Sequence, residues 1–118
     1  MTSFGTFVRT TREQLQAAGS ADHSLRKVAA RLGVTPAYLS KIETDEGSPP
    51  TEKTILALAA DLKVNPNVML AIAGRVSSEL QAIICQRPEL FAEMIEACRD
   101  MPDHAIVRIV REVRDGEW

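Results

Sequence analysis

Apolar residues recur every three or four positions along most of the chain, which is the spacing that places them on one face of an α-helix. In the N-terminal part this spacing predicts five helices, separated by short polar turns or by turns that contain glycine and proline. They are expected at about residues 3–18, 24–33, 35–44, 51–64 and 67–73. In the fifth, Val68, Met69 and Ile72 are expected to be buried.

Residues that favour helix ends flank the second and third of these segments. Ser24 supplies an oxygen that can cap the second helix, and Gly33 follows that helix where a left-handed residue is needed. Thr35 is expected to cap the third helix, and Pro36 occupies its first position, where a missing N–H costs nothing.

Three more amphipathic segments follow Gly74 and Arg75, at about residues 77–86, 88–99 and 103–115. They are too short to build a separate core, so their apolar faces are expected to pack on the first unit or on a partner chain. The expected fold is all-α: a five-helix unit over residues 1–74, then about three short helices over 75–118. The residues expected to form a dimer or partner interface are Leu90, Phe91, Met94, Ile106, Ile109, Val110 and Val113.

Composition excludes several classes of protein. No apolar run is long enough to span a membrane, and the N-terminus does not resemble a secretory signal, so a cytoplasmic protein is expected. Cys85 and Cys98 lie on apolar stripes, which favours buried thiols over a disulfide. The two histidines lack partners at metal-ligand spacing, and no nucleophile elbow or phosphate loop is present. We therefore expect no metal, no cofactor and no enzyme activity.

Charge is distributed unevenly along the chain. The net charge of −2 divides into +2 for residues 1–76 and −4 for residues 77–118. A mildly basic N-terminal part joined to an acidic segment fits a nucleic-acid-binding head with a separate region that faces protein.

The stretch from Ser24 to Glu43, SLRKVAARLGVTPAYLSKIE, predicts two helices that meet at a tight angle. Ala29 is small where the two helices meet, and Val34 closes the inside of the turn. Leu39 and Ile42 would anchor one face of the third helix, so that its other face projects into solvent. Such a helix is about as wide as the DNA major groove accepts.

This stretch resembles the helix-turn-helix of the Cro and phage-repressor family, also called the xenobiotic-response-element family. The resemblance covers roughly residues 5–73. It is carried by GTFVRTTRE in the first helix, then by VAARLGV, PAYLSKIE and PPTEKTILALAADLKV. It implies a transcription regulator that binds double-stranded DNA. The leading hypothesis is a repressor that acts as a homodimer through the major groove.

The resemblance also implies which residues approach DNA. Ser24 and the start of its helix would meet a phosphate through backbone N–H groups, while Ser40 and Lys41 would reach a base edge or the backbone. The full set of expected DNA-binding residues is Ser24, Thr35, Pro36, Ala37, Tyr38, Ser40, Lys41, Thr44, Arg9, Arg12 and Lys53.

The sequence leaves alternatives open for these residues and for the function of the chain. Arg9 and Arg12 could instead pair with Glu13 or other acids, and Glu43 is expected to bond within the head. Tyr38 and Lys41 could be ordinary surface residues. The chain could also be an antitoxin-like or adaptor protein, whose C-terminal helices bind a partner protein such as a toxin or a regulatory peptidase.

Overall fold

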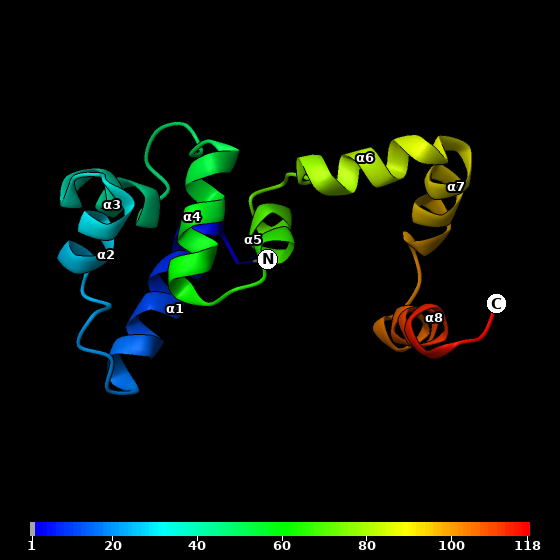
Figure 1. Ribbon diagram of the computed structural model, residues 1–118, viewed down its shortest axis with the longest axis horizontal. Coiled ribbons are helices and arrows are strands. Elements are labelled where there is room, and N and C mark those ends of the chain that lie inside the picture. The colour runs from blue at the N-terminus through cyan, green and yellow to red at the C-terminus, as the bar shows by residue number, and fades with distance from the viewer. Residues whose placement is uncertain (1) are drawn as a thin grey trace. The chain divides into compact units, whose positions relative to one another are not determined.

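The computed structural model describes residues 2–118, and within this range the secondary structure consists of α-helices without strands. The expected all-α class is thus confirmed. Figure 1 shows the helices in chain order. Their bounds are α1 Phe4–Ala17, α2 Leu25–Leu32, α3 Pro36–Glu43, α4 Glu52–Leu62, α5 Pro66–Ile72, α6 Ser78–Gln86, α7 Pro88–Cys98 and α8 Asp103–Asp115.

Short polar side chains start the first four helices. Ser3, Ser24, Thr35 and Thr51 each have extended backbone, and each side-chain oxygen accepts a hydrogen bond from the backbone N–H three residues later. These bonds satisfy N–H groups that have no partner inside the helix. The caps expected at Ser24 and Thr35 are therefore confirmed, and local sequence alone defines where α2 and α3 begin.

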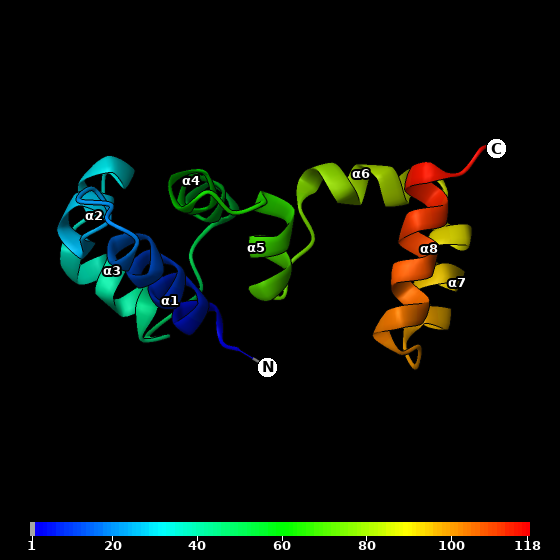
Figure 2. The ribbon, with the colours of Figure 1, turned by 90° about the horizontal axis from the view of Figure 1, so that it is seen from below.

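Contacts between residues divide the chain into two compact units, one ending at Leu80 and the other running from Gln81 to Trp118. The first unit holds the hydrophobic core, in which α1 packs on α3 and α4 and α2 packs on α3 and α4. Figure 2 shows these helices from a second direction. The core residues are Val8, Val28, Ala29, Leu39, Ile42, Ile55, Leu58, Ala59, Leu62, Met69 and Leu70.

The fifth helix differs from the sequence prediction. Met69 is buried as expected, but Val68 is 49% exposed and Leu70 is fully buried in its place. Ile72 is only partly buried. A seven-residue helix makes just two turns, so its apolar pattern did not determine which face packs on α4.

The loop between α1 and α2 is held by His23, which is buried. Its Nδ1 lies in hydrogen-bond contact with the Ser20 hydroxyl, and its Nε2 lies 3.1 Å from the carbonyl oxygen of Asp61. Arg31 donates to the carboxylate of Asp61 at 2.6 Å, which ties α2 to the end of α4. In residues 2–118 no group of three or more potential ligands could hold a metal ion.

The second unit contains α7, α8 and most of α6, and none of these three helices has a buried residue. The apolar stripe of α7 is not covered within the single chain, since Leu90 is 65% exposed and Ile95 is 55% exposed. The expectation of buried thiols is wrong for Cys85, which is exposed, while Cys98 is half-buried. Among the described residues, no helix combines the length and apolar character needed to cross a membrane.

The start of α6 is fastened to the start of α4. Glu52 accepts hydrogen bonds from the backbone N–H and the hydroxyl of Ser78, both at 2.8 Å. Arg75 donates to the carbonyl oxygen of Pro50 at 2.7 Å. These bonds fix the segment that leads out of the core to the N-terminal end of α4.

The Glu52 junction should respond to acid. The hydrogen bond from the Ser78 backbone N–H, followed by that from its hydroxyl, lowers the pKa of Glu52. A carboxyl with a lowered pKa contributes stability that is complete above about pH 4.3, the ordinary value, and is lost as pH falls through the lowered value. The NMR shift of the Ser78 amide proton should therefore titrate with a midpoint below the ordinary value. Glu52→Gln should abolish this titration, and a midpoint at or above 4.3 would contradict the assignment.

Candidate nucleic-acid interface

The turn between α2 and α3 is closed by Gly33, whose φ of 71° lies in the left-handed region. The N–H of Gly33 bonds the carbonyl of Ala30 at 3.1 Å, and the N–H of Val34 bonds the carbonyl of Ala29 at 3.0 Å. Glycine adopts this conformation without the steric penalty that other residues incur. Ala29 is fully buried, and its small side chain allows the two helices to approach closely.

Helix α3 is fixed to the core along one face. Leu39 is fully buried, Ile42 is 6% exposed, and Glu43 is buried at the end of the helix. Glu43 accepts two hydrogen bonds from the guanidinium of Arg12, at 2.8 and 3.0 Å. This confirms the expected structural role of Glu43 and fastens the C-terminal end of α3 to α1.

The opposite face of α3 is open to solvent. Tyr38 is 41% exposed, and the other side chains of this face are exposed as well. The exposed residues expected to approach DNA are Thr35, Pro36, Ala37, Tyr38, Ser40, Lys41 and Thr44. The structure thus brings these seven predicted residues together on α3 and its two caps, Thr35 and Thr44, with Ser24 at the start of the helix that precedes it.

Two of these hydroxyl groups already have partners in the free protein. Thr35 Oγ1 accepts from the N–H of Tyr38 at 3.1 Å, which leaves its hydroxyl hydrogen available as a donor. Thr44 Oγ1 instead donates to the carbonyls of Ser40 and Lys41, at 3.1 and 3.3 Å. Thr44 must give up these bonds before its hydroxyl can donate to a phosphate.

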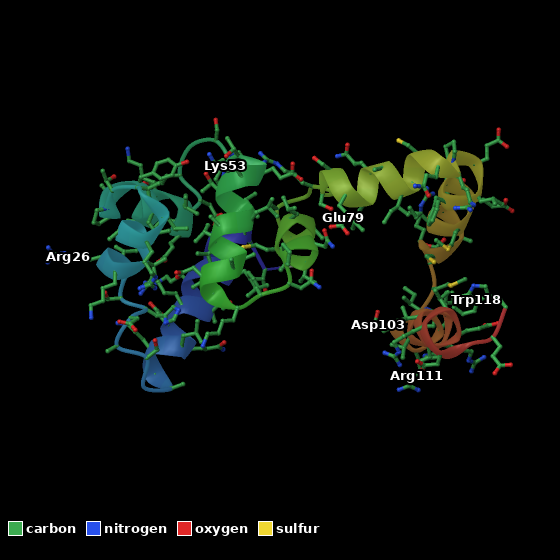
Figure 3. All side chains as sticks on the ribbon, in the orientation of Figure 1. Arg26, Lys53, Glu79, Asp103, Arg111 and Trp118 are labelled. Carbon is green, nitrogen blue, oxygen red and sulfur yellow. The ribbon has the colours of Figure 1, made fainter. Side chains whose placement is uncertain are left out.

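Four cations of the head have no ion-pair or hydrogen-bond partner for their side chains within residues 2–118, namely Arg26, Lys41, Lys53 and Lys63. The first three come from α2, α3 and α4, Lys63 caps the far end of α4, and Figure 3 labels Arg26 and Lys53 on their helices. Unpaired exposed cations are the groups that neutralise phosphates. Sequence reasoning missed Arg26, although its place just after the Ser24 cap on the polar side of α2 could have indicated it.

The two arginines of α1 have different environments. Arg9 pairs with Glu13 at 2.9 Å, and both side chains are more than half exposed. Arg12 is only 7% exposed and also donates to the carbonyl of His23 at 3.2 Å. The guanidinium of Arg12 is committed inside the fold, so the structure argues against the expected phosphate contact, and we exclude Arg12 from the interface.

Acidic residues follow α3, and the structure assigns one of them to a cap. Asp45 adopts a left-handed φ of 57°, and its Oδ1 accepts from the N–H of Gly5 at 2.8 Å. A carboxylate at the start of α1 is favourable because it meets the positive end of the helix dipole. Asp45 therefore joins the end of α3 to the beginning of α1.

A helix held by one apolar face, preceded by a glycine turn and another short helix, defines a helix-turn-helix domain. Residues 12–69 match the family model described as helix-turn-helix. Residues 12–69 therefore form a helix-turn-helix domain of the Cro and phage-repressor type, a family of DNA-binding domains of transcription regulators and not of enzymes. No curated protein and no solved structure matches the chain significantly.

Proposed function

We propose that this protein is a sequence-specific transcription repressor that binds DNA as a homodimer, with α3 in the major groove. The observation that carries the proposal is the exposed face of α3, held in place by Leu39, Ile42 and Glu43 on the opposite side. Repression needs only that the protein occupies its operator. A DNA-binding head and a segment that joins two chains supply this function.

The N-terminal half of α3 would lie nearest the base edges. Pro36 and Ala37 have side chains without donors or acceptors, so contact there is apolar, for instance with thymine methyl groups, or depends on DNA shape. Tyr38, Ser40 and Lys41 supply the polar contacts. One head should therefore discriminate only modestly between sequences, and two heads on a two-fold operator supply the rest.

The flanks of α3 would position the head on the phosphate backbone. Backbone N–H groups at the start of α2, beside Ser24, form one anion-binding end. Arg26 on α2 and Lys53 on α4 are exposed cations, and each would contact a phosphate. Arg9 would contribute only by leaving Glu13.

We assign residues 75–118 to joining two chains, with residues 1–74 as the DNA-binding part. The support is that α6, α7 and α8 have amphipathic sequences and yet no buried residue. The surface proposed for this contact comprises Leu90, Phe91, Met94, Ile106, Ile109, Val110 and Val113.

Selection of bound fragments from a random DNA pool tests the proposal. The wild-type chain should enrich a two-fold symmetric motif, because two heads read related half-sites. Lys41→Ala and Tyr38→Ala should weaken or blur the motif at matching positions in both halves. Glu79→Ala, an exposed change on α6 outside the proposed interface, serves as the control. Absence of any enriched motif for the wild type would refute the regulator function.

Salt dependence separates phosphate contacts from base contacts. Replacing Lys53 or Arg26 by alanine should reduce the slope of log K against log salt by about 0.9, since each phosphate cation releases about one counterion. Affinity should fall similarly for specific and random DNA. Fluorescence anisotropy between about 50 and 200 mM salt measures this slope. Lys63→Ala, an exposed lysine at the opposite end of α4, should leave the slope unchanged.

A further inference from the structure

Helix α8 exposes much of its apolar surface. Val107 is 44% exposed, Val110 is 52% exposed and Val113 is 60% exposed. Ile106 and Ile109 are partly buried, and Ile109 shares an open groove of about 680 Å³ with Phe91 of α7. One side of α8 thus lines a groove shared with α7, while Val107 and Val110 are exposed within the unit.

The open side of α8 carries an ordered stripe of four residues: Asp103, Val107, Val110 and Arg114. Their intervals of four, three and four residues place them within about 60° of one another on a helix with 3.6 residues per turn. All four are exposed. We call these four residues the α8 stripe. An acid and a base mark its two ends, and valines occupy its middle.

The α8 stripe can pair with the α8 stripe of a second copy that runs in the opposite direction. When two copies of α8 pack antiparallel about a two-fold axis between residues 108 and 109, Asp103 faces Arg114 of the second copy, and Val107 faces Val110 of the second copy. Every contact then occurs twice, as a two-fold interface requires. A parallel pair would instead place Asp103 beside Asp103 and Arg114 beside Arg114, which is repulsive.

The charged ends are available for this contact. Within residues 2–118, Asp103 has no hydrogen bond or ion pair for its side chain. Figure 3 shows it at the beginning of α8, pointing away from the helix. Arg114 pairs with Asp115 at 2.9 Å, and the side chains of both are more than 60% exposed. A guanidinium has five N–H donors, so one exposed carboxylate does not saturate it.

We propose that two copies of this chain associate through an antiparallel pair of α8 helices, with Asp103 of each copy paired with Arg114 of the other. The proposal rests on the homodimer proposed above and adds its orientation, register and charge pairs. On α8 it moves the contact to the open side: Val110 belongs to both surfaces, whereas Ile106 and Ile109 are partly buried within the unit. A second copy of the chain fits this surface because the α8 stripe contains both the acid, Asp103, and the base, Arg114, that the ion pairs need. One helix from each copy makes a small interface, so the dimer should dissociate at low concentration.

Charge reversal on the full-length chain tests the pairing without DNA. Asp103→Arg and Arg114→Asp should each weaken self-association about tenfold, because both ion pairs of the dimer become like-charge contacts. An equimolar mixture of the two variants should form a heterodimer of wild-type affinity. In that heterodimer one copy supplies two arginines and the other two aspartates. Sedimentation equilibrium measures the affinities, and native mass spectrometry identifies the heterodimer by mass.

Two matched variants control for the change in charge. Arg108→Asp and Glu112→Arg make changes of the same size on α8 but lie away from the α8 stripe, so self-association should stay within about twofold of wild type. Circular dichroism checks that helix content is retained. Recovery in the mixture also excludes unfolding as the cause of the weaker association.

The outcomes separate this inference from the proposed function. A wild-type dimer that is insensitive to both reversals, or a mixture no tighter than the single variants, would overturn the antiparallel pairing alone. A wild-type chain that stays monomeric at all concentrations would overturn the homodimer as well. DNA recognition by the head is judged separately, by the selection experiment.

Discussion

Replacing Glu43 by alanine should destabilise the first unit by about 3–5 kcal/mol, because the charge of Arg12 is left buried without its partner. Arg12 is 7% exposed, and its Nε and Nη2 atoms lie 2.8 and 3.0 Å from the two carboxylate oxygens of Glu43. The carbonyl of His23 and the amide oxygen of Gln16 accept the remaining bonds of Arg12 at 3.2 and 3.3 Å, but neither carries a charge. The whole stability of such a domain is only about 5–15 kcal/mol.

Urea denaturation followed by circular dichroism measures this loss. Arg9→Ala is the matched control on the same helix, because its pair with Glu13 is exposed and should contribute at most about 1 kcal/mol. Replacing both partners by apolar residues, as in Arg12→Met with Glu43→Leu, should cost less than the sum of the single changes. A loss below about 1 kcal/mol for Glu43→Ala would show that water reaches Arg12.

The local structure of the head could be predicted because short-range signals specify it. The side chains of Ser24 and Thr35 accept from N–H groups in the first turn of their own helix, and Pro36 has no N–H that would need a partner there. Gly33 adopts the left-handed φ of the turn itself. Such effects depend on neighbours in sequence, so the prediction of α2, the turn and α3 was confirmed.

The contacts that fix α3 to α1 were not predictable in the same way. Arg12 and Glu43 are 31 residues apart, and Gly5 and Asp45 are 40 residues apart. The sequence shows an arginine on a polar face and an acidic run, and both patterns are also typical of solvent-exposed residues. Only the crossing of α1 and α3 makes one arginine a buried structural group and one aspartate a helix cap.

The C-terminal helices show a second limit of prediction from sequence. An amphipathic pattern predicts that a face will be covered, but it does not say whether the cover comes from the same chain. Leu90 and Val110 have the sequence character of core residues and are more than half exposed in the single chain. The α8 stripe indicates a partner because an acid lies at one end and a base at the other. This arrangement favours antiparallel over parallel association of two copies.

Gly5→Ala is expected to destabilise the head by about 3 kcal/mol, although alanine usually stabilises a helix relative to glycine. A Cβ at position 5 would lie 2.4 Å from the carbonyl oxygen of Ile42 and 2.7 Å from that of Glu43. Both oxygens belong to the backbone at the end of α3 and cannot rotate away. The clash can be relieved only if α1 and the end of α3 move apart, which also strains the bond from Gly5 to Asp45 at 2.8 Å.

The position of α3 should therefore change together with stability. Gly33→Ala is the matched control, since a Cβ there meets nothing within 4 Å and its cost of about 1–2 kcal/mol comes only from the left-handed φ of 71°. We expect Gly5→Ala to unfold at markedly lower urea concentration than Gly33→Ala. Where both variants are fully folded, Gly5→Ala should bind the selected DNA more weakly, because the recognition face is displaced. Equal stability of Gly5→Ala and wild type would mean that the close approach of α1 to α3 does not fix the recognition helix.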